Sequence, residues 1–259
     1  MKKVWLTALG TSQDEVQGVM HSLQQYGLSA DGHFWEDNLA QMAWVKPRHN
    51  LLDPAICAWI MLASAEALGT ATIRQGLALL ALNIQAARGR DFPLVILQTS
   101  GATVTPESLP GPLAACEVFS CGAAGYGPKI VARVYGSKGQ VTPPPYRLDV
   151  HGLPGLGLWF EVGPREGAWQ GALFGTLGAE PDFHAVGPTG QLPEKTTLNF
   201  PEKGLRLEWS GQEIVAWAVK NTLDAASSYF VRVKGQPQAI VFSAYAAEAD
   251  AEVFVVKLQ

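Results

Sequence analysis

The sequence predicts an α/β unit with a parallel sheet, followed by an all-β unit whose antiparallel strands form a sandwich or a barrel. Over about 135 residues, strand-like apolar runs alternate with amphipathic helical segments, a pattern typical of a parallel sheet with right-handed crossovers. A proline-rich stretch at residues 143–145 follows. Beyond it the helical period disappears, and short apolar runs recur between glycine and proline turns, as in all-β folds. We therefore expect two domains, residues 1–141 and 142–259.

The first strand and the first helix have the strongest sequence signals. Residues 4–9 form a continuous apolar run, which suits a parallel strand that is covered on both faces. Ser12 and Glu15 have the spacing of a capping box, and apolar residues then recur at helical spacing as far as Gly27, where we expect the helix to end. Residues 28–35 follow as a weaker second strand.

Two further strands flank a second clear helix. Residues 56–62 are expected to be the third strand, and residues 72–88 carry apolar positions at helical spacing. Residues 91–97 predict a fourth strand, and residues 129–134 are a candidate for the fifth. The stretch from residue 36 to residue 50 has a mixed pattern that favours no element.

The C-terminal region contains eight runs with strand character. Glycine and proline residues separate them at a spacing that suits antiparallel strands joined by turns. Their tryptophan and phenylalanine residues are expected to fill a core between sheets rather than to line a groove. The runs are residues 158–162, 169–177, 197–200, 205–209, 214–219, 229–233, 239–244 and 253–258.

Composition excludes several classes of protein. Hydrophobic residues make up 47% of the 259 positions and charged residues 16%, which indicates a folded globular chain rather than a disordered one. The formal net charge is −4 and basic residues do not cluster, so we expect no nucleic-acid binding. No run approaches the ~18 apolar residues of a membrane span, so we expect no membrane association. Three cysteines, an odd number, fit a reducing cytoplasm.

The first part of the chain resembles the Toll/interleukin-receptor (TIR) domain and its flavodoxin-like relatives. The resemblance rests on the run at residues 4–9, the helix that ends at Gly27, the third strand that contains Trp59 and ends in Ser64, and the apolar run at 93–96. It implies a three-layer fold and a role in signalling or protein interaction. In that family a glutamate motif opens the next helix. Here the corresponding segment contains neither the glutamate nor the tryptophan-cysteine pair.

The segment from Gly69 to Ala78 is also similar to the nucleoside deoxyribosyltransferase motif, in which a Gly-Thr turn precedes glutamate, glycine and alanine on a helix. Gly76 and Ala78 match that pattern. The glutamate is again absent, and Arg74 and Gln75 lie near its position. This second resemblance implies chemistry at an N-glycosidic bond.

Small hydroxyl and glycine residues follow three strands of the expected parallel sheet, at the edge where ligands bind in such folds. With the free N–H groups of helix starts, they could hold a phosphate or a ribose; as caps and turns alone, they need no ligand. Glu66 is the one acid among them, and thus the alternative catalytic residue. The candidate ligand-binding residues are Gly10, Thr11, Ser12, Ser64, Glu66, Thr99 and Ser100. Acids near the second strand, either ribose contacts or exposed turn residues, are Asp31, Glu36 and Asp37.

Two functions remain open at this point. The missing glutamate favours a non-catalytic interaction or signalling protein with a degenerate TIR-like domain that binds a nucleotide or another protein. The alternative is an enzyme that cleaves or transfers at the N-glycosidic bond of NAD or a nucleoside through Glu66. We expect no cofactor and no metal, because the histidines lack the spacing of metal ligands. The oligomeric state is not predicted. The histidines are His21, His33, His49, His151 and His184.

Overall fold

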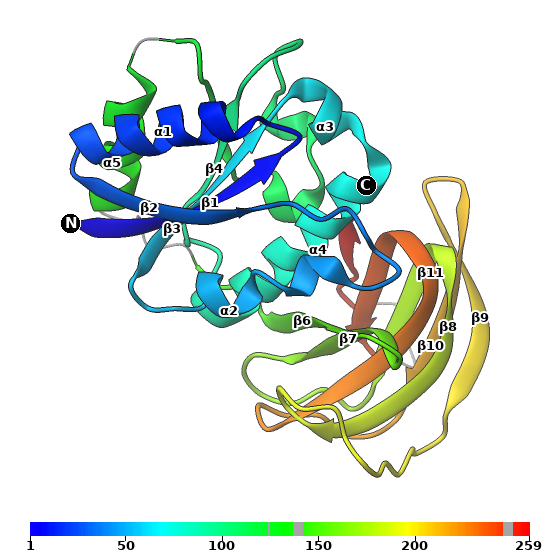
Figure 1. Ribbon diagram of the computed structural model, residues 1–259. Coiled ribbons are helices and arrows are strands. Elements are labelled where there is room, and N and C mark those ends of the chain that lie inside the picture. The colour runs from blue at the N-terminus through cyan, green and yellow to red at the C-terminus, as the bar shows by residue number, and fades with distance from the viewer. Residues whose placement is uncertain (124, 137–141, 246–250) are drawn as a thin grey trace. The chain divides into compact units, whose positions relative to one another are not determined.

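The computed structural model describes residues 1–123, 125–136, 142–245 and 251–259. The chain divides into two compact units, Met1–Thr142 and Pro143–Gln259, which Figure 1 shows as ribbons. A parallel sheet with helices makes up the first unit and an antiparallel sheet the second, which confirms the predicted fold class. The boundary expected after residue 141 adjoins residues 137–141, which lie outside the described residues.

The N-terminal unit is built on a five-stranded parallel sheet with the order β2-β1-β3-β4-β5. The chain runs outward from β1 to β2 and then returns to place β3 on the other side of β1, so the topological switch point lies between β1 and β3. The strands are β1 (Lys2–Leu9), β2 (Leu28–Phe34), β3 (Ile56–Ala63), β4 (Leu94–Gln98) and β5 (Glu117–Ser120).

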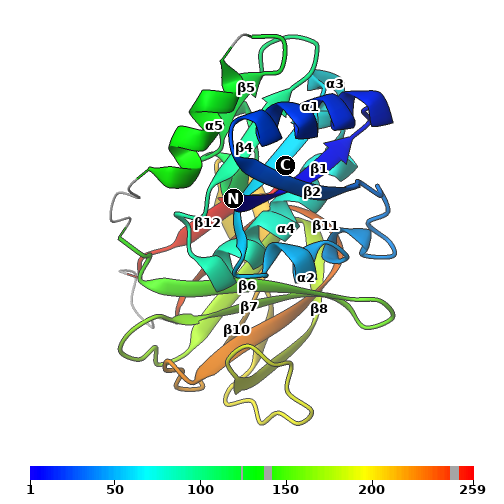
Figure 2. The same cartoon turned by 60° about the vertical axis from the view of Figure 1, so that its left-hand side comes forward.

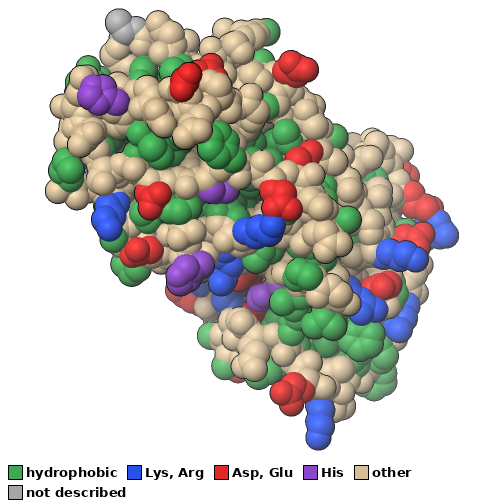
Figure 3. Space-filling view, in the orientation of Figure 1, with side chains coloured by type: hydrophobic (Ala, Val, Ile, Leu, Met, Phe, Trp, Pro, Cys, Tyr) green, Lys and Arg blue, Asp and Glu red, His purple; other side chains and the backbone are tan. Residues whose placement is uncertain are grey.

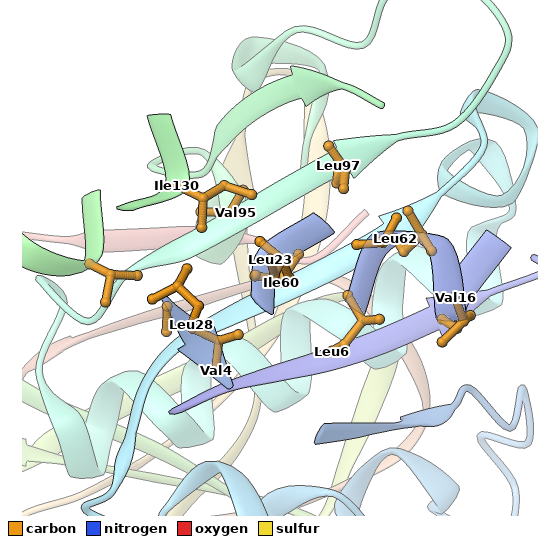
Figure 4. Packing of buried hydrophobic residues seen from close by; sticks show 14 residues of the cluster. Val4, Leu6, Val16, Leu23, Leu28, Ile60, Leu62, Val95, Leu97 and Ile130 are labelled. Carbon is orange, nitrogen blue, oxygen red and sulfur yellow. The ribbon is translucent and has the colours of Figure 1, made fainter. Parts of the chain in front are cut away.

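Helices cover both faces of this sheet, which gives three layers (Figures 1 and 2). One face packs against α1 and α5 through a core of aliphatic side chains that includes Leu23, Ile60 and Ile130 (Figure 4). On the other face lies α4, which is buried without a break from Gln75 to Ile84, as expected of a helix that is apolar all round. The helices are α1 (Gln13–Gln25), α2 (Arg48–Leu51), α3 (Ala65–Gly69), α4 (Ala71–Arg88) and α5 (Tyr126–Tyr135).

The fifth strand does not lie where the sequence predicted it. Residues 129–134 belong to α5, and two of them, Ile130 and Val134, are buried four residues apart on one helix face. The fifth strand is instead the short, half-buried Glu117–Ser120. A short apolar run rich in β-branched residues fits either a strand or one side of a helix, and its spacing matches the helix here.

The C-terminal unit is a seven-stranded antiparallel sheet with the order β6-β7-β11-β8-β10-β9, and β12 also pairs with β11. Two predictions for this region were wrong: residues 197–200 form no strand, and the two runs from 229 to 244 are a single strand. The strand at residues 146–153 was not among the predicted runs. The strands are β6 (Tyr146–Leu153), β7 (Gly157–Pro164), β8 (Ala172–Pro188), β9 (Glu202–Trp209), β10 (Gln212–Val219), β11 (Ser227–Ala244) and β12 (Phe254–Lys257).

This sheet is bent so that its two halves face each other. Phe160 pairs with Val231 of β11, whereas Phe174 pairs with Phe242 much further along the same strand. At about 3.3 Å per residue, these pairing positions on a straight strand would be more than 30 Å apart, yet the rings of Phe160 and Phe174 stack with centroids 5.4 Å apart. The bend coincides with a break in the β8–β11 register after Gly235, and bulges of this kind turn strands from one layer of a sandwich into the other.

Charged side chains of both signs are interspersed with apolar and neutral ones on the face drawn in Figure 3. This distribution is unlike the broad basic surface of a protein that binds a phosphate backbone. None of the helices in the described residues is long and apolar enough to cross a membrane.

Candidate functional site

The three predicted segments do come together at the carboxyl edge of the parallel sheet. They follow β1, β3 and β4, which are neighbours in the sheet. The N–H of Ala65 donates to the carbonyl oxygen of Ser100 at 2.9 Å, and the N–H of Thr99 donates to the carbonyl oxygen of Ala63 at the same distance. The segments after β3 and β4 are therefore joined by backbone hydrogen bonds.

Two hydroxyl groups of the predicted site cap helices. The Oγ of Ser12 accepts a hydrogen bond from the N–H of Glu15 at 3.2 Å, and the carboxylate of Glu15 accepts one from the N–H of Ser12 at 2.9 Å. This confirms the predicted capping box. The Oγ of Ser64 accepts from the N–H of Ala67 at 3.1 Å. These groups satisfy N–H groups that the helix itself leaves unpaired, so they are only partly available to a ligand.

Thr11 differs from its neighbours. Its Oγ1 is buried and has no hydrogen-bond partner among the described residues, a situation that costs free energy unless a ligand or water supplies the partner. Gly10 has a φ of +65°, and a Cβ added there would meet open space. A polar group that a ligand could satisfy therefore lies at the end of β1, next to the switch point.

No carboxylate of α4 faces this edge, because the helix sequence contains no acid. Arg74 instead donates to the carbonyl oxygens of Leu68, at 3.2 Å, and Ser108, at 2.7 Å, and Gln75 is buried. Glu66 is exposed in the first turn of the five-residue helix α3. The acid nearest to the edge in sequence is thus exposed, whereas catalytic carboxyl groups are usually found in a cleft.

The acids near β2 are exposed and have local partners. Asp37 accepts a hydrogen bond from the Oγ1 of Thr72, at 2.6 Å, at the start of α4. Glu36 pairs with Lys46, and Asp31 accepts from the N–H of Gly32. These contacts match the interpretation of these acids as turn and surface residues.

A surface pocket of about 430 Å³ lies between β5 and α5, away from the predicted residues. Its charged side chains have partners: Arg133 pairs with Glu117 at 3.0 Å, and the ammonium of Lys129 lies 5.6 Å from the ring centre of Phe119. The pocket thus offers a ligand few unpaired groups.

The C-terminal unit brings together three residues that the sequence analysis did not combine. Asp149 and His151 lie on β6 and share one face of the strand, and Glu161 of β7 pairs directly with Asp149. The Nε2 of His151 lies 2.8 Å from the Oε2 of Glu161. One possible ligand atom from each of the three residues lies within 4.8 Å of those of the other two. We call these three residues the β6–β7 cluster.

Glu161 is held in its ionised form. Its exposed fraction is 2%, and burial by itself raises the pKa of a carboxyl group. Hydrogen bonds from His151, the N–H of Gly190 and the hydroxyl of Ser228 outweigh this effect, so the pKa of Glu161 lies below its ordinary value. The Gly190 contact, 2.8 Å to Oε1, leaves Oε2 directed at His151.

Arg147 continues the same face of β6 but bonds to other groups. Its side chain crosses Gly163, where an added Cβ would lie 2.8 Å from Nη2. Burial lowers the pKa of Arg147, and the negative charge of Glu161 partly offsets this change. The guanidinium donates to the carbonyl oxygens of Pro164, Asp224 and Ser227 and to the hydroxyls of Thr189 and Ser228.

A buried histidine, His184, lies on the inner face of the bent sheet. The Nδ1 of His184 is 2.8 Å from the hydroxyl of Tyr229, and its ring packs edge-on against Trp217 with centroids 4.8 Å apart. Burial, assisted by the charge of Lys203, lowers the pKa of His184 to about 4. The ring is therefore neutral at physiological pH and serves as part of the core.

The signal for the β6–β7 cluster was present in the sequence as a hairpin. Pro154 and Gly155 form a turn signal, and Asp149 and Glu161 each lie six positions from Gly155, which places them opposite each other in a hairpin centred there. Metal-ligand spacing along the chain does not reveal the cluster, because residues paired across two strands show no such spacing.

No protein-family model and no curated protein matches this chain. The similarity to TIR domains and to nucleoside deoxyribosyltransferases therefore rests on the quoted residues alone.

Proposed function

We propose that this is a non-catalytic interaction or signalling protein of the cytoplasm, whose N-terminal unit binds a small ligand of nucleotide type. The site lies at the carboxyl ends of β1 and β3. The observation that carries the proposal is the buried Oγ1 of Thr11, which has no hydrogen-bond partner among the described residues. It lies next to the topological switch point, the place where ligands bind in open parallel sheets.

The surroundings of Thr11 suit a ligand with hydroxyl or phosphate groups. The capping box leaves the first N–H groups of α1 directed toward the same edge, where a helix start favours negative charge. Asp14 and Glu15 in that first turn oppose a highly charged ligand. A nucleoside or a nucleotide with one or two phosphates therefore fits better than a triphosphate.

The absence of a positioned carboxylate supports a non-catalytic role. Cleavage of an N-glycosidic bond needs an acid or nucleophile within hydrogen-bond reach of the sugar. Glu66 is exposed on a short helix, and Arg74 is engaged with two backbone carbonyls. A reaction of the TIR or deoxyribosyltransferase type would therefore require a catalytic group that is not held rigidly at this edge.

The test measures binding and turnover on the same preparation. Isothermal titration with AMP, adenosine and NAD should show binding of at least one of them that weakens about 5- to 10-fold in Thr11→Val, which removes a single hydrogen bond of about 1 kcal/mol. Ser29→Ala, at the opposite end of β2, should bind as the wild type does. Thr11→Val is a cleaner probe than Gly10→Val, because Gly10 has a positive φ that strains a branched residue.

Chromatography of the same mixtures should show no released base. Base release that disappears in Glu66→Gln would overturn the proposal in favour of an enzyme acting at the N-glycosidic bond. Binding that is equal in Thr11→Val and the wild type would place the ligand elsewhere.

A further inference from the structure

The β6–β7 cluster has the composition of a metal site. It offers one imidazole nitrogen and two carboxylates, with ligand atoms within 4.8 Å of one another. Three protein ligands with the remaining positions open is a common arrangement for a metal that also binds water or substrate. Asp149 and His151 are half-buried, so the cluster can exchange an ion with solvent.

The strand register explains why a cation would be stabilising there. Asp149 and Glu161 lie directly opposite each other in the antiparallel pair β6–β7, which are neighbours in Figure 1. Like charges at directly opposite positions destabilise a sheet. A cation between the two carboxylates converts this repulsion into attraction.

Arg147 does not occupy that position. Its guanidinium is directed toward carbonyl and hydroxyl oxygens around Thr189 and Ser228, and Gly163 provides the space for it to lie there. Its positive charge acts on Glu161, so it offsets part of the repulsion between the two carboxylates but does not bridge them.

The cluster is also supported by surrounding groups. The N–H of Gly190 fixes one carboxylate oxygen of Glu161, the kind of contact that orients metal ligands in established sites, and the other oxygen faces the Nε2 of His151. Both strands that supply ligands are paired along their length, which gives the site a rigid frame.

We propose that Asp149, His151 and Glu161 bind one divalent first-row transition metal ion, of the Mn²⁺ or Zn²⁺ class. The imidazole favours these ions over Mg²⁺ and Ca²⁺, which prefer oxygen ligands alone. The site belongs to the C-terminal unit and is independent of the ligand site at the end of β1.

The experiment titrates the full chain, first freed of metal by a chelator, with MnCl₂ and ZnCl₂. Electron paramagnetic resonance and calorimetry should show one Mn²⁺ per chain, and the unfolding temperature should rise with metal concentration. Affinity should fall about 10-fold or more in Asp149→Asn and in His151→Gln. His49→Gln and Glu208→Gln remove the same kinds of group from exposed positions and should bind as the wild type does.

A second readout needs no variant. Mn²⁺ should broaden the backbone amide resonances of Asp149, His151 and Glu161 at ratios of metal to protein well below one. Absence of binding at millimolar Mn²⁺, equal affinity in wild type and both ligand variants, or broadening centred elsewhere would overturn the proposal. Binding of Mg²⁺ as tight as that of Mn²⁺ would overturn the role of His151.

Discussion

The two units hold their polar residues in different ways. At the carboxyl edge of the parallel sheet, Ser12 and Ser64 follow strands and satisfy the first turns of α1 and α3. In the antiparallel unit, Asp149, His151 and Glu161 lie within paired strands and contact one another. The side chains of these loop residues are thus hydrogen-bonded to nearby backbone N–H groups. The side chains of the strand residues instead interact across the strand pair.

The difference also sets how each site tolerates change. A residue at the edge of the parallel sheet can lose its side chain while water replaces the hydrogen bond. Within the β6–β7 cluster a lost partner leaves a buried charge unpaired, which is far more costly. Four predictions test this contrast, beginning with the largest effect.

The first prediction compares a buried and an exposed carboxylate. Glu161→Ala should lower the free energy of unfolding by about 3–5 kcal/mol, because it removes the acceptor for His151 and Gly190 in a buried network. Glu66→Ala should change it by less than about 0.5 kcal/mol. Urea unfolding followed by circular dichroism measures both, and similar losses in the two variants would contradict the contrast.

The second prediction concerns pH. His184 is neutral in the folded chain with a pKa of about 4, against an ordinary value of 6.5. The unfolded chain binds the proton more readily, so this group's stabilisation is complete above pH 6.5 and falls by roughly 3 kcal/mol as pH drops toward 4. Urea unfolding at a series of pH values should show a shallower acid loss in His184→Gln; identical profiles would refute the assignment.

The third prediction uses two glycines with different surroundings. Gly163→Ala would place a Cβ 2.8 Å from the guanidinium of Arg147 and should cost about 1–3 kcal/mol. Gly18 lies on α1 with open space around it. Gly18→Ala should therefore stabilise the protein by up to about 1 kcal/mol. Thermal unfolding measures the direction of both stability changes. An unchanged stability in Gly163→Ala would show that the side chain of Arg147 has room to move.

The smallest effects are expected at the helix caps. Ser12→Ala and Ser64→Ala should each cost about 1 kcal/mol, the usual value for a lost cap. Ser64→Gly should cost only a few tenths of that amount, because glycine is tolerated at this position. A loss above 3 kcal/mol in denaturant unfolding would mean that these hydroxyls do more than cap.

Much of the parallel unit could be predicted from the sequence because its signals are local. The continuous apolar run before Gly10 and the capping box at Ser12 and Glu15 each lie within a few residues of chain. The strand prediction for residues 129–134 was wrong because an apolar segment of six residues is too short to distinguish the period of a strand from that of a helix. The predicted edge residues were brought together, since parallel strands end at one edge whatever their exact register.

The antiparallel unit was harder because its decisive contacts depend on register. Gly235 and Pro237 suggested a turn between two strands, whereas the structure bends one continuous strand there. The β6–β7 cluster was missed for the same reason, because its three residues can be recognised as neighbours only when the register of β6 and β7 is known. The absence of a carboxylate on α4, by contrast, could be read directly from the sequence, because it does not depend on how the strands pair.

The most direct test of separate sites in the two units is one series of ¹H–¹⁵N correlation spectra of the full chain. AMP, adenosine or NAD, whichever binds, should shift the amide resonances of Gly10, Thr11 and Ser64, with no change over time that would indicate turnover. Zn²⁺ should instead shift those of Asp149, His151 and Gly190 and leave the first set in place. Shifts of both sets by one ligand, or shifts in neither unit, would contradict the account.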